Sequence, residues 1–406
     1  TDAVAALCLR NNYLQTLALS VAEYRGLAEF PDHLSLIDAL ERRGLLNRAV
    51  ESLPDDKALR ERAAAGRGLT RPELAVILAY AKLTLFTDLM ATKVTDDPYL
   101  SKELYRYFPE RLDETFPDAV SSHRLRREVI ATVLSNAMIN RGGPAFVNEL
   151  QTATSADAGQ IAAAYAAARD SYGLQDLNAR LDTLDGNISG QTQLVLYAEI
   201  EQLLTRQTLW FLRNANFESG LQPLIERYAE GIAAIRDHLP ALIPPFHADL
   251  LARRAAAFES SGVPRDIARR IAELSALSLG ADIVLVADRS GVEVLEAAAA
   301  LFGVLETFRL GRIIDAGSRI VLADRFDRMA LDRALANLMR AQRDLTADVL
   351  AAGSGDIASR LATWRTAHPE AIDRVTAAVQ GLTEGDMTVS RLSVAAGLLA
   401  DLAKSA

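Results

Sequence analysis

The stretch from residue 66 to residue 82 reads GRGLTRPELAVILAYAK, and it predicts the start of a long helix. Thr70 can cap the first turn, and Glu73, three residues later, can reach back to the N–H of Thr70. Pro72 falls in the first turn, where its missing N–H has no intrahelical partner to lose. Apolar residues then recur at helical spacing: Leu74, Ile77, Leu78, Ala81 and Leu85. The stretch therefore favours a capped helix with one apolar face.

Composition extends this helical signal to the whole chain. Half of the 406 residues are hydrophobic and only 6% are aromatic. Alanine and leucine dominate, and both are strong helix formers, so the sequence predicts an all-α, multi-helix bundle. Residues 281–287 and 319–323 are rich enough in β-branched side chains to form strands. Because isolated strands need partners, we predict buried helix at both places.

We divide the chain into three parts at polar and glycine-rich stretches. Residues 1–65 are predicted to form an N-terminal helical segment. Residues 66–215 form a first helical subdomain. Residues 216–406 form a second helical subdomain and a C-terminal tail.

A weak internal repeat appears at an offset of 136 residues. Each copy follows an alanine-rich helix and precedes a long helix, predicted at residues 191–213 and 326–350. The matching residues are Tyr165, Tyr172, Leu174 and Leu177 in the first copy, and Leu301, Phe308, Leu310 and Ile313 in the second. Two interpretations stay open. The subdomains are related helical units that share a fold, or amphipathic alanine- and leucine-rich helices resemble one another by chance.

The charge balance excludes several partners. Lys and Arg number 44 and Asp and Glu number 53, which gives a net charge of −9. An acidic chain is a poor match for nucleic acid or an anionic membrane. No apolar run reaches the roughly 18 residues needed to span a bilayer. The single cysteine, Cys8, allows no intrachain disulfide, which suits a reducing cytoplasm.

A search for chemistry finds no recognisable set of site residues. Gly66 and Gly68 are followed by Arg71 where a dinucleotide-binding fingerprint needs glycine. No phosphate-binding Gly-Lys-Ser/Thr loop occurs, and the five histidines show no metal-ligand spacing. We therefore predict no catalytic residue, no cofactor site and no metal site in this chain.

One basic cluster is the best candidate for a functional surface. A helix is predicted at residues 118–140, with an apolar stripe of Val129, Ile130, Val133, Leu134 and Met138. Arg124, Arg127 and Arg141 are the candidate inter-domain contact, since planar guanidinium groups pair well with carboxylates of another surface. The alternative is a solvated helix face on which Arg124 pairs with Glu128.

Several strings resemble a known family in order and spacing. They are NYLQT at residues 12–16, the stretch 66–82, DPY at 97–99, HRLRREVIATVLSN at 123–136 and NRGG at 140–143. Together they are similar to the C-terminal, non-catalytic region of the large bacterial NAD-specific glutamate dehydrogenases. A start at Thr1 without methionine fits the expectation that the chain is part of a longer polypeptide.

The resemblance implies a parent enzyme that oxidatively deaminates glutamate to 2-oxoglutarate and ammonia with NAD. In that family the catalytic residues and the NAD loop precede this region, so none is carried over to a position here. The expected partners are the catalytic domain of the same polypeptide, which the segment of residues 1–65 would join to this chain, and further copies in a homo-oligomer. Two alternatives remain. The first is a regulatory helical module that binds a small effector, and a pocket of converging Arg, Asn and Tyr side chains would favour it. The second is an unrelated helical scaffold.

Overall fold

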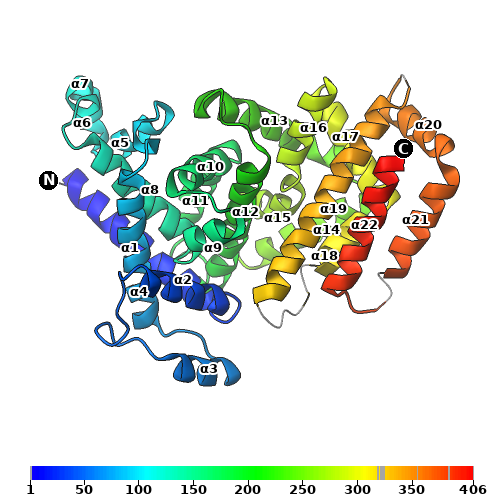
Figure 1. Ribbon diagram of the computed structural model, residues 1–406. Coiled ribbons are helices and arrows are strands. Elements are labelled where there is room, and N and C mark those ends of the chain that lie inside the picture. The colour runs from blue at the N-terminus through cyan, green and yellow to red at the C-terminus, as the bar shows by residue number, and fades with distance from the viewer. Residues whose placement is uncertain (1, 318–319, 321–324, 354, 383–384, 406) are drawn as a thin grey trace. The chain divides into compact units, whose positions relative to one another are not determined.

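The computed structural model describes residues 2–317, 320, 325–353, 355–382 and 385–405 (Figure 1). All regular structure within these residues is helical and none is strand, which confirms the predicted all-α fold. Residues 281–287 lie in helix α16 (Gly280–Ser290), as predicted. Of the other strand-like stretch, residues 319–323, only Ile320 is among the described residues.

Contacts within the chain define two compact units. The first unit comprises Thr1–Arg227 and Ser261–Val263, and the second comprises Tyr228–Ser260 and Pro264–Ala406. The three-part division proposed from the sequence stays a prediction. No helix among the described residues has the length and apolar character needed to cross a lipid bilayer.

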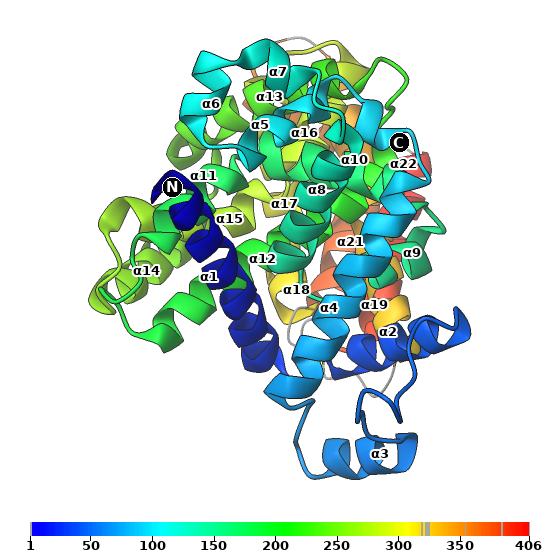
Figure 2. The same ribbon diagram turned by 90° about the vertical axis from the view of Figure 1, so that its left-hand side faces the viewer.

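The first unit is a stack of helices around α8 and α12. Its α-helices are α1 (Asp2–Arg25), α2 (Phe30–Arg42), α3 (Asp56–Ala64), α4 (Arg71–Met90), α5 (Lys102–Tyr107), α6 (Glu110–Thr115), α7 (Pro117–Ser121), α8 (Arg126–Gly142), α9 (Phe146–Thr154), α10 (Ala158–Ser171), α11 (Leu174–Asp182) and α12 (Gly190–Asn214); the 3₁₀ turns are η1 (Val94–Asp96) and η2 (Tyr99–Ser101). Helix α8 packs on α4, α10 packs on α12, and α1 contacts α4, α8 and α12 (Figure 2).

Helix α4 begins as its sequence predicts. The backbone N–H of Thr70 donates to the Glu73 carboxylate at 2.7 Å, which closes the capping box. The apolar row that follows is buried, and Ile77 has no exposed surface. Local side-chain chemistry therefore sets the start of the helix, and its apolar face sets its place in the core.

The helix predicted over residues 118–140 is wrong as a single element. Helix α7 ends at Ser121 and α8 begins at Arg126. Between them the Ser122 hydroxyl donates to the Asp118 carbonyl, and the His123 ring accepts the N–H of Leu125. These side chains occupy backbone groups that a continuous helix would use, so the helix is interrupted. The apolar stripe within α8 is confirmed, since its central members Ile130, Leu134 and Met138 are fully buried.

The second unit is built around the long helix α19. Its helices are α14 (Pro245–Ser260), α15 (Arg265–Leu277), α16 (Gly280–Ser290), α17 (Val294–Thr307), α18 (Leu310–Gly317), α19 (Arg325–Ala351), α20 (Ile357–Ala367), α21 (Pro369–Leu382) and α22 (Val389–Ser405). Helix α13 (Leu221–Leu242) includes residues of both units. Within the second unit, α22 and α17 pack along α19, and α20 contacts both α17 and α19.

The internal repeat is present as a repeated series of helices. Tyr172 ends α10, Gly173 adopts a left-handed conformation with φ +63°, and α11 follows. Phe308 ends α17, Arg309 adopts φ +52°, and α18 follows. The long helices α12 and α19 match the predicted ranges to within one residue at each end. All eight matched side chains are buried, so both stretches contain the same series of helices. Both interpretations of the repeat, related units and chance similarity, stay predictions.

Candidate functional site

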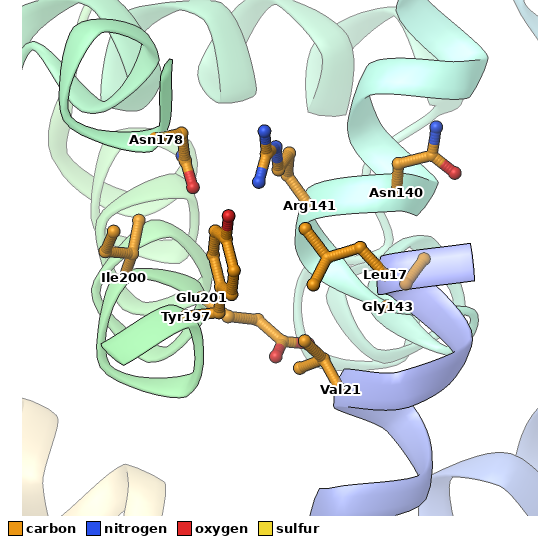
Figure 3. Close-up of a pocket in the computed structure, with 10 residues that line it drawn as sticks. Leu17, Val21, Asn140, Arg141, Gly143, Asn178, Tyr197, Ile200 and Glu201 are labelled. Atoms are coloured by element: carbon orange, nitrogen blue, oxygen red, sulfur yellow. The ribbon is translucent and has the colours of Figure 1, made fainter. Parts of the chain in front are cut away.

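The first unit contains a small polar pocket where four helices meet (Figure 3). Its lining residues come from α1, α8 and its C-cap, α11 and α12: Leu17, Ala18, Val21, Asn140, Arg141, Gly143, Asn178, Tyr197, Ile200 and Glu201. The cavity offers ≈ 20 Å³ to the centre of a water-sized sphere. A site needs roughly 10–15 Å³ by this measure to hold one water, so the pocket can take a water or an ion of similar size.

Arg141 forms the upper wall of this pocket. Its Nη2 donates to both oxygens of Asp182, at 3.0 and 2.7 Å, and the Tyr197 hydroxyl donates to the same carboxylate at 2.5 Å. The guanidinium carbon lies 5.4 Å from the centroid of the Tyr197 ring. Burial, and then the charge of Asp182, raise the pKa of the Tyr197 hydroxyl far above its ordinary value. Tyr197 therefore stays a protonated hydrogen-bond donor at any physiological pH.

Glu201 forms the opposite wall and is only 5% exposed. Arg25 lies between two carboxylates, 3.3 Å from Glu201 and 2.8 Å from Glu29. Burial raises the pKa of Glu201, while the charge of Arg25 opposes that rise. Gly143 has φ +85°, and a Cβ at this position would lie 2.9 Å from Glu201 Oε1. The backbone conformation therefore favours glycine here, and any other side chain would have to displace the Glu201 carboxylate.

His33 adds a titratable group to the Arg25–Glu29 pair. Its ring is fully buried, and its Nε2 lies 3.7 Å from the Glu29 carboxylate. Burial, and then the nearby charge of Arg25, lower the pKa of His33 to about 4. The imidazole is therefore neutral in the folded protein at physiological pH.

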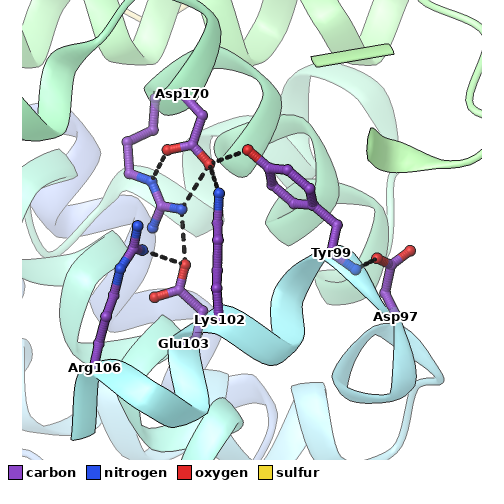
Figure 4. Close-up of polar contacts among 7 residues, drawn as sticks. Asp97, Tyr99, Lys102, Glu103, Arg106 and Asp170 are labelled. Carbon is purple, nitrogen blue, oxygen red and sulfur yellow. Dashed lines mark hydrogen bonds and ion pairs between the residues drawn. The ribbon is translucent and has the colours of Figure 1, made fainter. Parts of the chain in front are cut away.

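A second polar cluster joins α5 to the end of α10 (Figure 4). We call it the α5 ionic cluster; its members are Tyr99, Lys102, Glu103, Arg106, Arg169 and Asp170. Asp170 accepts hydrogen bonds from Tyr99 at 2.8 Å, Lys102 at 2.7 Å and Arg169 at 2.7 Å. Glu103, which is 1% exposed, accepts from Arg169 at 2.7 Å and from Arg106 at 2.6 Å. Each carboxylate of the cluster is therefore paired with at least two cations.

The electrostatics of Asp170 follow from these contacts. Burial alone would raise the pKa of Asp170, but the hydrogen bonds and charges of Arg169 and Lys102 outweigh burial and hold it well below its ordinary value. The ammonium of Lys102 also lies 3.5 Å from the centroid of the Tyr99 ring. The arrangement is a saturated ion network that ties two elements together, with no carboxylate left to act as a base.

The structure gives the three sequence-predicted arginines different partners. Arg127 donates to the Thr95 hydroxyl at 3.1 Å and to the Thr92 carbonyl at 2.9 Å, so it holds the turn before α5. Arg141 is paired inside the pocket. Arg124 is exposed and makes no hydrogen bond or ion pair with the rest of the described chain. The inter-domain contact proposed for these residues stays a prediction.

Sequence reasoning missed both polar clusters. The pocket draws on four helices, and the α5 ionic cluster joins residues 66 to 71 positions apart in the chain. The sequence contained one local sign of the pocket: Arg141 is followed by two glycines, and the second of them, Gly143, lies against Glu201. Within the described residues, no group of three or more His, Cys, Asp or Glu side chains is arranged to hold a metal ion.

Comparison with known proteins relates the chain as a whole to one family. A family model described as glutamate dehydrogenase, C-terminal, matches residues 66–401. An NAD-specific glutamate dehydrogenase of Pseudomonas aeruginosa is 34% identical over 408 residues, which cover 100% of this chain and 25% of that protein. The enzyme of the same name from Halomonas elongata is 32% identical and covers 91% of this chain and 23% of its own length. That from Mycobacterium tuberculosis is 27% identical, with 98% and 24% covered. The chain thus spans about a quarter of the length of the curated relatives it matches.

Proposed function

This chain belongs to the glutamate dehydrogenase C-terminal family, and from that premise we propose that it is the non-catalytic helical region of an NAD-specific glutamate dehydrogenase. In this proposal the region packs against the catalytic domain of the same polypeptide and supports assembly of a homo-oligomer. The parent enzyme converts glutamate to 2-oxoglutarate and ammonia, with NAD bound outside this region. The single cysteine, Cys8, supports a reducing, cytoplasmic location.

The observation that supports a non-catalytic role is the family match to residues 66–401, whose regular structure is helical throughout the part that the structure describes. Dinucleotide sites of dehydrogenases usually lie at the carboxyl ends of parallel strands, beside a glycine-rich turn. Here the polar side chains serve helix packing instead. In the α5 ionic cluster, for example, Asp170 and Glu103 are saturated by Lys102, Arg106 and Arg169. Carboxylates that are paired in this way support a packing role for the cluster.

A regulatory module that binds a small effector is the second candidate. The polar pocket favours it, because Arg141, Asn178 and Tyr197 converge there. Size argues the other way. Ligand pockets are commonly about 300–1,000 Å³, and this cavity has room for one water. An effector would have to separate helices and break the bidentate contact between Arg141 and Asp182. We therefore favour the packing and assembly role.

Two measurements test the proposal. Calorimetric titration of the 406-residue chain with NAD should give no saturable heat at millimolar ligand, while the full-length enzyme should bind NAD in the same assay. Removing this region from the full-length enzyme should shift its sedimentation toward smaller species. A micromolar NAD isotherm for the chain would overturn the non-catalytic role, and unchanged sedimentation of the truncated enzyme would overturn the assembly role.

A further inference from the structure

Three short helices of the first unit expose large apolar side chains together. We call residues 102–125, with helices α5, α6 and α7, the α5–α7 arm. Four of its apolar side chains are exposed, namely Tyr107 at 49%, Leu112 at 40%, Phe116 at 56% and Leu125 at 50%. The part of the arm from residue 105 onward buries little apolar surface. Of the described apolar side chains in that part, Val120 is the one that is buried. Where exposed apolar side chains form one contiguous patch, they commonly mark an interaction surface.

The arm is held in place at its base. The α5 ionic cluster fastens Lys102 and Glu103 to Arg169 and Asp170 of α10, and α5 also packs on α8. Helices α6 and α7 contact each other and α5, and both ribbon views place the three helices together at one edge of the first unit. The exposed side chains are therefore presented on an ordered base, which reduces the entropy lost when a partner binds.

Three residue types of the arm are common in binding surfaces. Tyrosine, phenylalanine and arginine are enriched at the centres of protein interfaces. Arg124, the one sequence-predicted arginine without an intrachain partner among the described residues, lies directly beside Leu125. An exposed apolar side chain beside a guanidinium group matches a partner surface that is apolar and has a carboxylate at its edge, because guanidinium groups pair well with carboxylates.

We propose that the α5–α7 arm docks onto the part of the same polypeptide that lies outside this chain, with Phe116 and Leu125 in an apolar surface and Arg124 paired with a carboxylate. The inference rests on the proposed function. The relatives are about four times as long as this chain, so most of their surface belongs to that other part. A surface linked in the same polypeptide is also present at high effective concentration, roughly millimolar for a short flexible linker.

Hydroxyl-radical footprinting of the full-length protein tests the contact. Phe116 and Tyr107 should be modified several-fold more slowly than Phe326 of the second unit, although the exposed fractions of Phe116 and Phe326 are similar, at 56% and 62%. Protection should persist when the protein is diluted until its oligomer dissociates. Equal modification of Phe116 and Phe326 would overturn the proposal, and so would protection that disappears on dilution, which would indicate a second copy as the partner.

Variants give an independent readout. The triple change Phe116→Ser, Arg124→Glu and Leu125→Ser should raise the rate of limited proteolysis between this region and the rest of the full-length protein several-fold. The matched change Phe326→Ser should leave that rate unchanged. If the triple variant is cleaved like the parent while the truncation described above still disrupts assembly, the arm is not the docking surface and the proposed function stands. If truncation has no effect either, the proposed function itself fails.

Discussion

Replacing Phe308 by alanine probes the junction that defines the internal repeat. The Phe308 ring is completely buried, and its centroid lies 6.2 Å from that of Trp364 in an edge-on arrangement. An aromatic side chain buries about 150–250 Å², which at about 25 cal/mol per Å² gives roughly 4–6 kcal/mol as an upper estimate. Core Phe→Ala changes cost about 3–5 kcal/mol once partial collapse of the cavity is included. We expect Phe308→Ala to lower the free energy of unfolding by about 3–5 kcal/mol.

The assay is urea unfolding of the chain followed by far-UV circular dichroism. Phe326→Ala is the matched control, because that ring is 62% exposed and its loss should change the free energy of unfolding by no more than about 0.5 kcal/mol. Tyr172→Ala tests the other copy of the junction and should cost a similar amount to Phe308→Ala, since Tyr172 is 4% exposed and donates to Gln207 at 2.8 Å. If Phe308→Ala unfolds at the same urea concentration as Phe326→Ala, the junction is not a packing anchor.

Two further changes test the polar clusters by chemical denaturation. Asp170→Asn should cost at most about 3–5 kcal/mol at neutral pH, because it leaves the half-buried Lys102 without a carboxylate and the buried Arg169 with Glu103 alone. Because the pKa of Asp170 is lower in the folded state than in the unfolded state, its carboxylate stabilises the fold above the unfolded-state pKa, and this stabilisation is lost as pH falls. The variant lacks this carboxylate, so acid should lower its free energy of unfolding less than that of the parent. The pKa of His33 is about 4 in the folded state and 6.5 in the unfolded state, so the unfolded chain binds more protons between these pH values. The free energy of unfolding should therefore fall by about 3 kcal/mol as pH falls from 6.5 to 4. His33→Leu should remove that part of the pH dependence, and an unchanged slope would show that His33 is not its source.

The parts of the fold that could be predicted from the sequence are those fixed by neighbouring residues. The capping box of Thr70 and Glu73 spans four positions, and the structure contains it. The apolar row of α8 was equally readable, because residues three and four apart share a helix face. The break before α8 was missed, because Ser122 and His123 compete with the backbone without the glycine or proline that usually marks a helix end.

The polar sites could not be predicted for a different reason. Asp170 meets Lys102 across 68 residues of chain, and Arg141 meets Asp182 across 41. Such pairings depend on how helices are stacked, and a single sequence contains no local signal of that stacking. Arg127 and Arg141 therefore looked like surface groups, because their carboxylate and carbonyl partners lie on other elements.

The repeat shows how packing can select a conformation that local preference does not. Gly173 adopts its left-handed backbone without steric penalty, whereas Arg309 adopts the same conformation at a cost of about 1–2 kcal/mol. That cost is tolerable because the residues on either side, Phe308 and Leu310, are both fully buried and fix the chain at the junction. The two copies thus share large buried residues around one left-handed position, and not the residue at that position.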